Sequence, residues 1–191
     1  MRIHYLFFLL FFYPWHLLMA QPDLQIIDDR SSGDLSTLNG DHWSLVTDNV
    51  MGGVSQGRLT TTSIEDRKCL RMQGEVKLDN NGGFVQMSLN ISDAVLHNIT
   101  EYSGIMLQVY GNEQQYNIHL RTTDVSLPWQ SYRSTLYAPS EWKTIHLPFS
   151  EFRPHSIDYP MDIAKLKRVG IVAIGREFEA DLCIGKLALY R

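Results

Sequence analysis

The sequence lacks the cationic clusters that nucleic-acid-binding proteins use. Its 17 Lys and Arg residues are outnumbered by 21 Asp and Glu residues, and the formal net charge is −4. Because affinity for nucleic acid comes mainly from neutralising phosphates, this balance argues against a nucleic-acid partner. The composition, 44% hydrophobic and 20% charged, is that of a globular protein rather than a disordered one.

Motifs for catalysis and metal binding are also missing. The histidines after residue 20 are scattered without H-E-x-x-H spacing, which disfavours a catalytic zinc site. G-x-S-x-G is absent, so no nucleophile elbow is expected. We therefore predict a non-enzymatic protein without a cofactor or metal, although a structural calcium ion held by loop oxygens stays open.

Cysteine is scarce. The chain has only Cys69 and Cys183, and neither belongs to a C-x-x-C motif or a Cys/His cluster. In an oxidising compartment the two can form a disulfide. Two free thiols on separate strands are the alternative, and the sequence leaves both open.

Long segments with helical periodicity are absent after residue 20. Short apolar-alternating runs instead follow one another, separated by Gly, Asn, Asp, Ser and Pro; the alternation is clearest in residues 116–121, YNIHLR. A period of two residues is typical of a strand with one buried face. Many short strands at regular spacing predict one all-β domain, a sandwich or barrel, over residues 21–191.

The first twenty residues, MRIHYLFFLLFFYPWHLLMA, differ from the rest. Arg2 precedes an apolar run, and Ala20 suits the position before a cleavage site. Residues 1–20 are therefore predicted to be a signal peptide that exports the protein to the periplasm or the extracellular space. An uncleaved membrane anchor is the alternative, because the apolar stretch approaches the ~20 residues that span a bilayer.

The glycine-rich stretch TDNVMGGVSQG, residues 47–57, does not fit a phosphate-binding loop. Such a loop needs a following helix and a Lys or helix N-terminus to meet the anion, whereas strand-like RLTTTS follows here. Paired glycines in a β-protein typically mark a bulge, a tight turn or a close approach of another backbone. We predict a turn of this kind.

Four segments in order carry a resemblance to a known family. They are WSLVTDNVMGGVS, DNNGGFVQM from Asp79, IHLRTTD from Ile118, and W-x-x-x-x-L-P-F-x-x-F-x-P from Trp142 to Pro154. Together they resemble the complex I intermediate-associated protein 30 family, a branch of the galactose-binding-domain-like sandwiches.

This resemblance implies a jelly-roll β-sandwich. The best-known members of the family look like assembly factors for the respiratory NADH dehydrogenase that act by binding. Related sandwiches bind carbohydrates on a concave sheet face or at loop tips. The export leader departs from the mitochondrial transit peptide of those assembly factors, so their partner does not carry over with the fold.

Two groups of residues are candidates for binding. Asp48, Asn49, Asn80 and Asn81 lie in the two glycine-flanked turns, where they either contact a sugar or partner or hydrogen-bond their own backbone. The second group combines polar groups with aromatic rings on two strands of an expected hairpin, and an ordinary solvated sheet face is its alternative. Its members are Asn117, His119, Arg121, Trp129, Tyr132 and Arg133.

Two hypotheses of function follow. The first is an exported binding module that holds a protein partner during complex assembly or scaffolding, using the glycine-flanked turns and the face of Asn117, His119 and Arg121. The second is a carbohydrate-binding module in which Trp129, Tyr132 and Arg121 line a groove.

Overall fold

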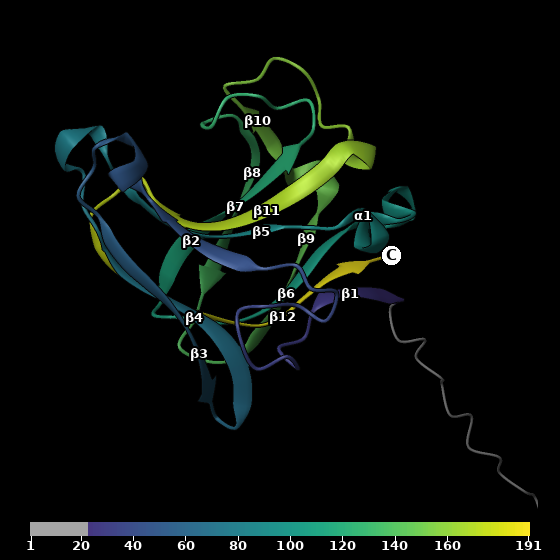
Figure 1. Cartoon of the computed structure of the whole chain (residues 1–191), viewed down its shortest axis with the longest axis horizontal. Helices are drawn as coiled ribbons and strands as arrows, with labels where there is room; N and C mark the ends of the chain where they lie inside the picture. Colours follow the sequence, from purple (N-terminus) through teal and green to yellow (C-terminus); the bar gives the residue numbers. More distant parts are fainter. Residues whose placement is uncertain (1–22) are drawn as a thin grey trace, which may run out of the picture.

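Two antiparallel β-sheets pack face to face (Figure 1). The computed structural model describes residues 23–191, so the predicted leader, residues 1–20, lies outside the described residues. The first sheet contains, in order, β3 (Gln56–Ile64), β4 (Arg67–Val76), β12 (Phe178–Tyr190), β6 (Gly104–Tyr110) and β9 (Lys143–Pro148), with β1 (Leu24–Asp28) also paired to β12. The second sheet contains β10 (Arg153–His155), β8 (Ser131–Ala138), β7 (Gln114–Thr122), β11 (Leu166–Ile174), β5 (Phe84–Asn90) and β2 (Trp43–Thr47). The predicted all-β sandwich is confirmed.

The alternation of apolar and polar residues explains why these segments form half-buried strands. In β7, Tyr116, Ile118 and Leu120 belong to the core between the sheets, whereas Asn117 and Arg121 are only partly buried. Because successive side chains of a strand point to opposite faces, one face of β7 is directed into the core and the other outward.

Helical structure among residues 23–191 is confined to short connections. They are η1 (Asp48–Met51), η2 (Asp79–Asn81), α1 (Asp93–Leu96), η3 (Ile99–Glu101), η4 (Phe149–Glu151) and η5 (Ile163–Lys165). Among the described residues, no helix has the length and apolar character needed to cross a membrane.

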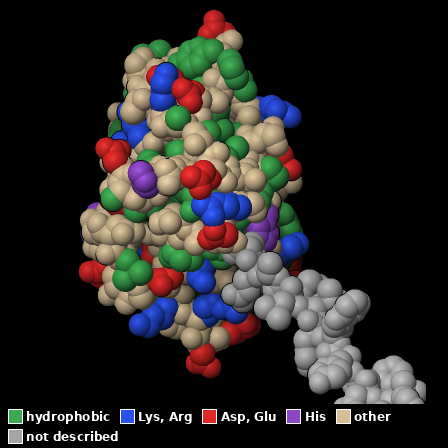
Figure 2. Space-filling model, turned by 90° about the vertical axis from the view of Figure 1, so that its right-hand side faces the viewer, with side chains coloured by type: hydrophobic (Ala, Val, Ile, Leu, Met, Phe, Trp, Pro, Cys, Tyr) green, Lys and Arg blue, Asp and Glu red, His purple; other side chains and the backbone are tan. Residues whose placement is uncertain are grey.

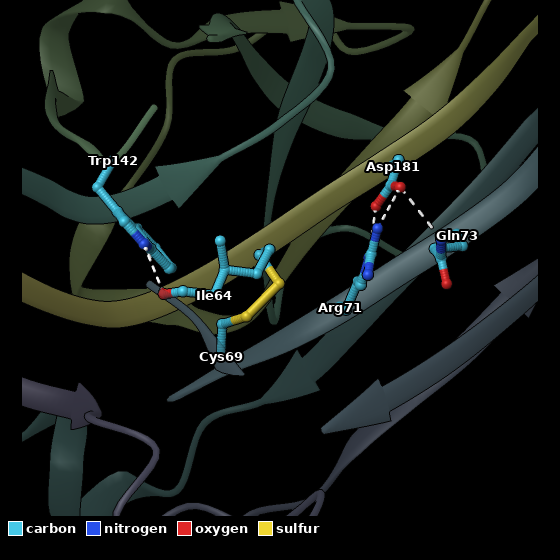
Figure 3. Close-up of a disulfide and its surroundings, with 7 residues drawn as sticks. Ile64, Cys69, Arg71, Gln73, Trp142 and Asp181 are labelled. Atoms are coloured by element: carbon cyan, nitrogen blue, oxygen red, sulfur yellow. Dashed lines mark hydrogen bonds and ion pairs between the residues drawn. A yellow bond between two sulfur atoms is a disulfide. The ribbon is translucent and has the colours of Figure 1, made fainter. Parts of the chain in front are cut away.

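A disulfide joins Cys69 of β4 to Cys183 of β12, two neighbouring strands of the first sheet (Figure 3). Their Cα atoms are 5.5 Å apart and 114 residues separate them in the chain. Both cysteines are buried although they lie outside the apolar core cluster, on the outer side of the sheet. Arg30 and Gly33, from the segment after β1, line the same surface hollow as Cys69. The bond therefore fixes two central strands beneath the N-terminal segment.

Replacing both cysteines with alanine (Cys69→Ala with Cys183→Ala) is expected to lower the free energy of unfolding by about 2–5 kcal/mol, because a cross-link closing so long a loop restricts the unfolded chain. Urea denaturation followed by tryptophan fluorescence measures the change. Wild-type protein treated with reductant should lose the same amount. Two titratable thiols in denatured, unreduced wild-type protein would show that the bond does not form.

Candidate functional site

The glycine-rich stretch surrounds a buried carboxylate of the protein itself. Asp48, the first residue of η1, is fully buried. Its carboxylate accepts hydrogen bonds from the backbone N–H of Ser55 at 2.9 Å and of Phe84 at 3.2 Å, and also from the backbone N–H of Gly83. The Ser55 hydroxyl donates to it as well. Asp48 thus ties the turn at η1 to the second glycine turn, at η2.

Two glycines make room for this carboxylate. A Cβ atom at Gly53 would overlap the Asp48 side chain, and one at Gly82 would lie 2.5 Å from Asp48 Oδ2. Burial alone would raise the pKa of Asp48, but the hydrogen bonds from Ser55, Gly83 and Phe84 together outweigh it, so the pKa is lowered. The predicted turn is therefore present, and the anion it surrounds is internal.

The candidate binding residues of the two turns differ in their exposure to solvent. Asp48 was predicted as a candidate binding residue, and its complete burial corrects that prediction, since a ligand cannot reach it. Asn49, Asn80 and Asn81 are exposed. Asn80 and Asn81 have φ values of 56° and 58°, the left-handed region that asparagine tolerates in turns. A binding role for these three asparagines stays a prediction.

The second sheet brings most of the other candidates together on its outward side. Strand register places His119 opposite Arg133 on β8 and opposite Gly170 on β11, with Asn117 and Arg121 two positions away on the same face. Figure 1 shows β2, β5 and β11 curving so that this side is concave along the strands. We call this side the outer face of the second sheet; its members are Ser44, Val46, Gln86, Ser88, Asn90, Gln115, Asn117, His119, Arg121, Ser131, Arg133, Thr135, Tyr137, Arg168, Gly170 and Val172.

The predicted aromatic groove is only partly correct. Tyr132 lies on the opposite face of β8, buried in the core, and its hydroxyl donates to the carbonyl of Pro160 at 3.2 Å. It therefore cannot line the groove, because adjacent residues of a strand point to opposite faces and Arg133 points outward. Tyr137, 48% exposed, is separated from Arg133 by an even number of positions on β8, so it lies on the outer face instead. Counting in steps of two from Arg133 would have found it in the sequence.

Trp129 lies in the loop before β8 and is 57% exposed. Its carbonyl accepts a hydrogen bond from Arg133 Nη2 at 3.3 Å, so the loop is tied to the outer face. Leu127 and Tyr159 are other exposed apolar residues of the loops near β10. In Figure 2, hydrophobic side chains gather at the top of the view, the end at which β10 lies in Figure 1. An apolar margin thus borders this end of the outer face.

At the centre of the outer face, a glycine lets a neighbouring side chain pack against the backbone. Gly170 carries no side chain there, and the Gln86 amide lies over it, 2.8 Å from where a Cβ atom would be. Beside Gly170, His119 is 9% exposed and its Nε2 atom has no hydrogen-bond partner. Thr135 donates to Asn117 Oδ1 at 2.8 Å. Amide and hydroxyl groups of β5, β7 and β8 therefore share this face with Gly170 and Val172 of β11.

His119 is uncharged at neutral pH. Burial is the main cause that lowers its pKa, to about 3, and the positive charges of Arg133 and His155 act in the same direction. The Nε2 atom is itself buried, so a ligand cannot reach it, and the neutral imidazole is a packed part of this sheet face.

Arg121 supports the loop between β7 and β8. Its guanidinium donates to the carbonyls of Pro128 at 3.0 Å and Leu127 at 3.1 Å, while Nε is buried without a partner. Burial lowers its pKa, as does the nearby positive charge of Arg168. Arg121 is thus mainly a positioning group for the loop that carries Trp129.

Among residues 23–191, no three or more His, Cys, Asp or Glu side chains are grouped so that they could hold a metal ion. The outer face of the second sheet therefore offers hydrogen-bonding and cationic groups as its chemistry.

Comparisons with known proteins agree with this architecture. Residues 27–184 match the family model described as complex I intermediate-associated protein 30. Among solved structures, the chain is similar to a family 11 carbohydrate-binding module of a cellulosomal cellulase of Clostridium thermocellum, with 15% identity, a TM-score of 0.66, and coverage of 90% of this chain and 96% of that one. The same module in complex with a β-1,3-1,4-mixed-linked tetrasaccharide gives 16% identity, a TM-score of 0.66 and coverage of 87% and 95%.

A family 30 carbohydrate-binding module is similar at 8% identity, with a TM-score of 0.57 and coverage of 90% of this chain and 88% of that one. The TM-scores, at such low identity, show a shared jelly-roll fold alone. No curated protein matches the chain in sequence.

Asp48→Ala is expected to lower the free energy of unfolding by about 2–4 kcal/mol, because it leaves several buried N–H groups without an acceptor. Thermal and urea unfolding measure the loss. Asp79→Ala, at an exposed aspartate of the neighbouring η2 turn, should change stability little. Equal losses in the two variants would contradict the structural role of Asp48.

The pH dependence of stability should reveal His119. The unfolded chain binds a proton at this histidine below a pH of about 6.5, whereas the folded protein does so only near pH 3. The stability contributed by the neutral imidazole is therefore present above pH 6.5 and is lost as the pH falls toward 3. His119→Gln should flatten this part of the curve of unfolding free energy against pH, and His97→Gln, at an exposed histidine, should not.

Proposed function

The chain belongs to the complex I intermediate-associated protein 30 family, and we infer that it acts by binding a carbohydrate, without catalysis, on the outer face of its second sheet. The sequence favoured a protein partner as its first hypothesis and a carbohydrate as its second. We place the carbohydrate first, because the geometry of this face supports it.

The observation that carries the proposal is a group of uncharged polar side chains from three strands of one face. Thr135 of β8 and Asn117 of β7 are paired in register, and Gln86 and Ser88 of β5 lie across Val172 and Gly170 of β11. Amides supply both donors and acceptors, and hydroxyls do the same, which is what a sugar ring with several hydroxyls requires. A ligand can therefore be held at many points without any single charged contact.

Aromatic rings border this group. Tyr137 lies on the outer face at one end, and Trp129 lies in the loop at the other. Rings of this kind stack on the apolar faces of sugars, while the neighbouring polar groups fix the orientation. The likeness in fold to a module solved with a bound tetrasaccharide supports the same assignment.

Export through the leader remains our prediction and is consistent with the proposal. Many polysaccharides lie outside the cytoplasm, and a disulfide such as that between Cys69 and Cys183 persists in oxidising compartments. The intact mass of the protein from native cells tests export, since cleavage after Ala20 removes the leader.

A protein partner is the second candidate function, and the tip of the η1 turn favours it. Val50 is 74% exposed and Met51 62% exposed, and Leu78 is an exposed apolar residue just before the η2 turn. Asp48 joins these two turns, so their apolar side chains are presented from one rigid end of the sandwich. Exposed apolar groups of this kind mark sites of protein association.

Exchange of Asn117 and Gln86 for alanine, in one double variant, is expected to weaken glycan binding about tenfold through the loss of two or more hydrogen bonds. Affinity electrophoresis in gels containing soluble polysaccharides measures the retardation, and melting curves confirm that the variant is folded. Gln56→Ala, at an exposed glutamine of the first sheet, is the matched control.

Crosslinking in native cells separates the two candidates. If Met51→Ser removes a crosslinked protein partner while glycan retardation is unchanged, the turn tip has a function of its own. If neither wild type nor variant is retarded by any polysaccharide, the carbohydrate proposal is wrong.

A further inference from the structure

Charge is divided unevenly between the two sheets. The six strands of the second sheet, all of which lie within residues 23–191, contain no Asp or Glu. Their cationic residues are Arg121, Arg133, Arg153, Lys167 and Arg168. The strands of the first sheet, in contrast, carry both signs of charge. Their acidic residues are Asp28, Glu75, Glu179 and Asp181, beside six Lys and Arg residues. A protein with a net charge of −4 thus has one sheet without a carboxylate.

Strand register brings these arginines next to one another. Arg168 on β11 lies opposite Arg121 on β7, and Arg153 on β10 lies opposite Arg133 on β8. Like charges directly opposite each other on neighbouring strands are destabilising. The arrangement therefore costs stability unless an anion is bound.

In the part of the chain that the structure describes, two arginines of the second sheet lack the kind of ionic partner that Arg71 of the first sheet has. On the first sheet, Arg71 forms a bidentate pair with Asp181, with nitrogen–oxygen distances of 2.7 and 2.6 Å (Figure 3). Within residues 23–191, the ion pairs of the structure do not include Arg133 or Arg168. These two arginines are partly buried cations without a counter-charge.

Hydrogen bonds hold the guanidinium groups of Arg133 and Arg168 in place and leave other N–H groups of each available to a ligand. Arg133 donates from Nε to the Ser131 hydroxyl at 2.9 Å and from Nη2 to the Trp129 carbonyl. Arg168 donates from Nε to Asn90 Oδ1 at 2.6 Å. Burial lowers the pKa of Arg133, which indicates that its positive charge is incompletely solvated. Positioned guanidinium groups of this kind suit carboxylates, sulfates and phosphates.

We propose that the ligand of the outer face is an acidic oligosaccharide whose carboxylate or sulfate groups bind Arg133 and Arg168, while Gln86 and Asn117 hold its hydroxyls. This inference rests on the proposed carbohydrate-binding function and names the class of sugar. The amide and hydroxyl group beside the arginines favours a glycan over an acidic peptide, because it matches ligand hydroxyls. The net negative charge of the protein disfavours long nucleic acids.

The experiment compares acidic polysaccharides with neutral counterparts of the same backbone, using the full-length protein. Polygalacturonate against its methyl ester tests carboxylates, dextran sulfate against dextran tests sulfates, and mixed-linked β-glucan serves as an unrelated neutral glycan. At least one acidic polymer should bind about tenfold more tightly than its neutral form, as a charge-assisted hydrogen bond implies. The preference should weaken at high salt, because exposed charges are screened.

Arg133→Gln and Arg168→Gln should each reduce binding of the acidic polymer about tenfold and reduce binding of neutral glycans much less. Arg133→Lys, which keeps the charge but loses the planar fork, should fall between Arg133→Gln and wild type. Arg58→Gln, at an exposed arginine of the first sheet, removes the same charge and should bind as wild type does. Melting curves show which variants are folded.

Each result has a distinct meaning. Equal binding of acidic and neutral forms would overturn the inference while leaving the carbohydrate proposal intact. Absence of binding to every polysaccharide would overturn both. Binding of a single-stranded oligonucleotide as tight as that of the acidic glycan would also overturn the inference, because recognition would then depend on charge alone.

Discussion

The burial of one face of each sheet is the constraint on which the rest of this structure depends. Tyr116, Ile118 and Leu120 of β7 are packed between the sheets, and each fully buried side chain of this size stabilises the fold by about 1.5–3 kcal/mol. A shift of the strand by one residue would bury Asn117 and Arg121 instead. Register is therefore strongly fixed, and the outward positions of the polar groups follow from the apolar ones.

The buried Asp48 shows the same dependence at the end of the sandwich. A carboxylate without partners would destabilise the fold, but here it accepts hydrogen bonds from Ser55, Gly83 and Phe84. Two turns that are far apart in the chain thereby become one rigid unit. Its tip presents Val50 and Met51, so the internal hydrogen bonds and the exposed apolar surface belong to one arrangement.

The distribution of charge links the fold to the proposed ligand. Net charge describes the whole molecule, and at −4 it excludes a general affinity for polyanions. A local face can still be cationic when the acidic residues lie elsewhere, as Asp181 does on the first sheet beside Arg71. A saccharide with acidic groups can therefore bind this face although the protein as a whole is negative.

The sequence by itself determined the all-β class, the outward face of Asn117, His119 and Arg121, and the turn character of the glycine-rich stretch. These features are local, because alternation and turn chemistry involve residues within a few positions of one another. The prediction placed Tyr132 on the wrong face although the pattern was local, because Tyr132 and Arg133 are adjacent in β8 and cannot both line one face.

Only the tertiary structure decided which groups hydrogen-bond to Asp48 and which arginines lie next to one another. Asp48 meets Gly83 across 35 residues of chain, and no local pattern encodes that contact. Arg121, Arg133 and Arg168 come from three strands whose order in the sheet is not their order in the sequence. Pairing between distant strands is set by the packing of the whole core, so the charge of a sheet face emerges only when the strands are assembled.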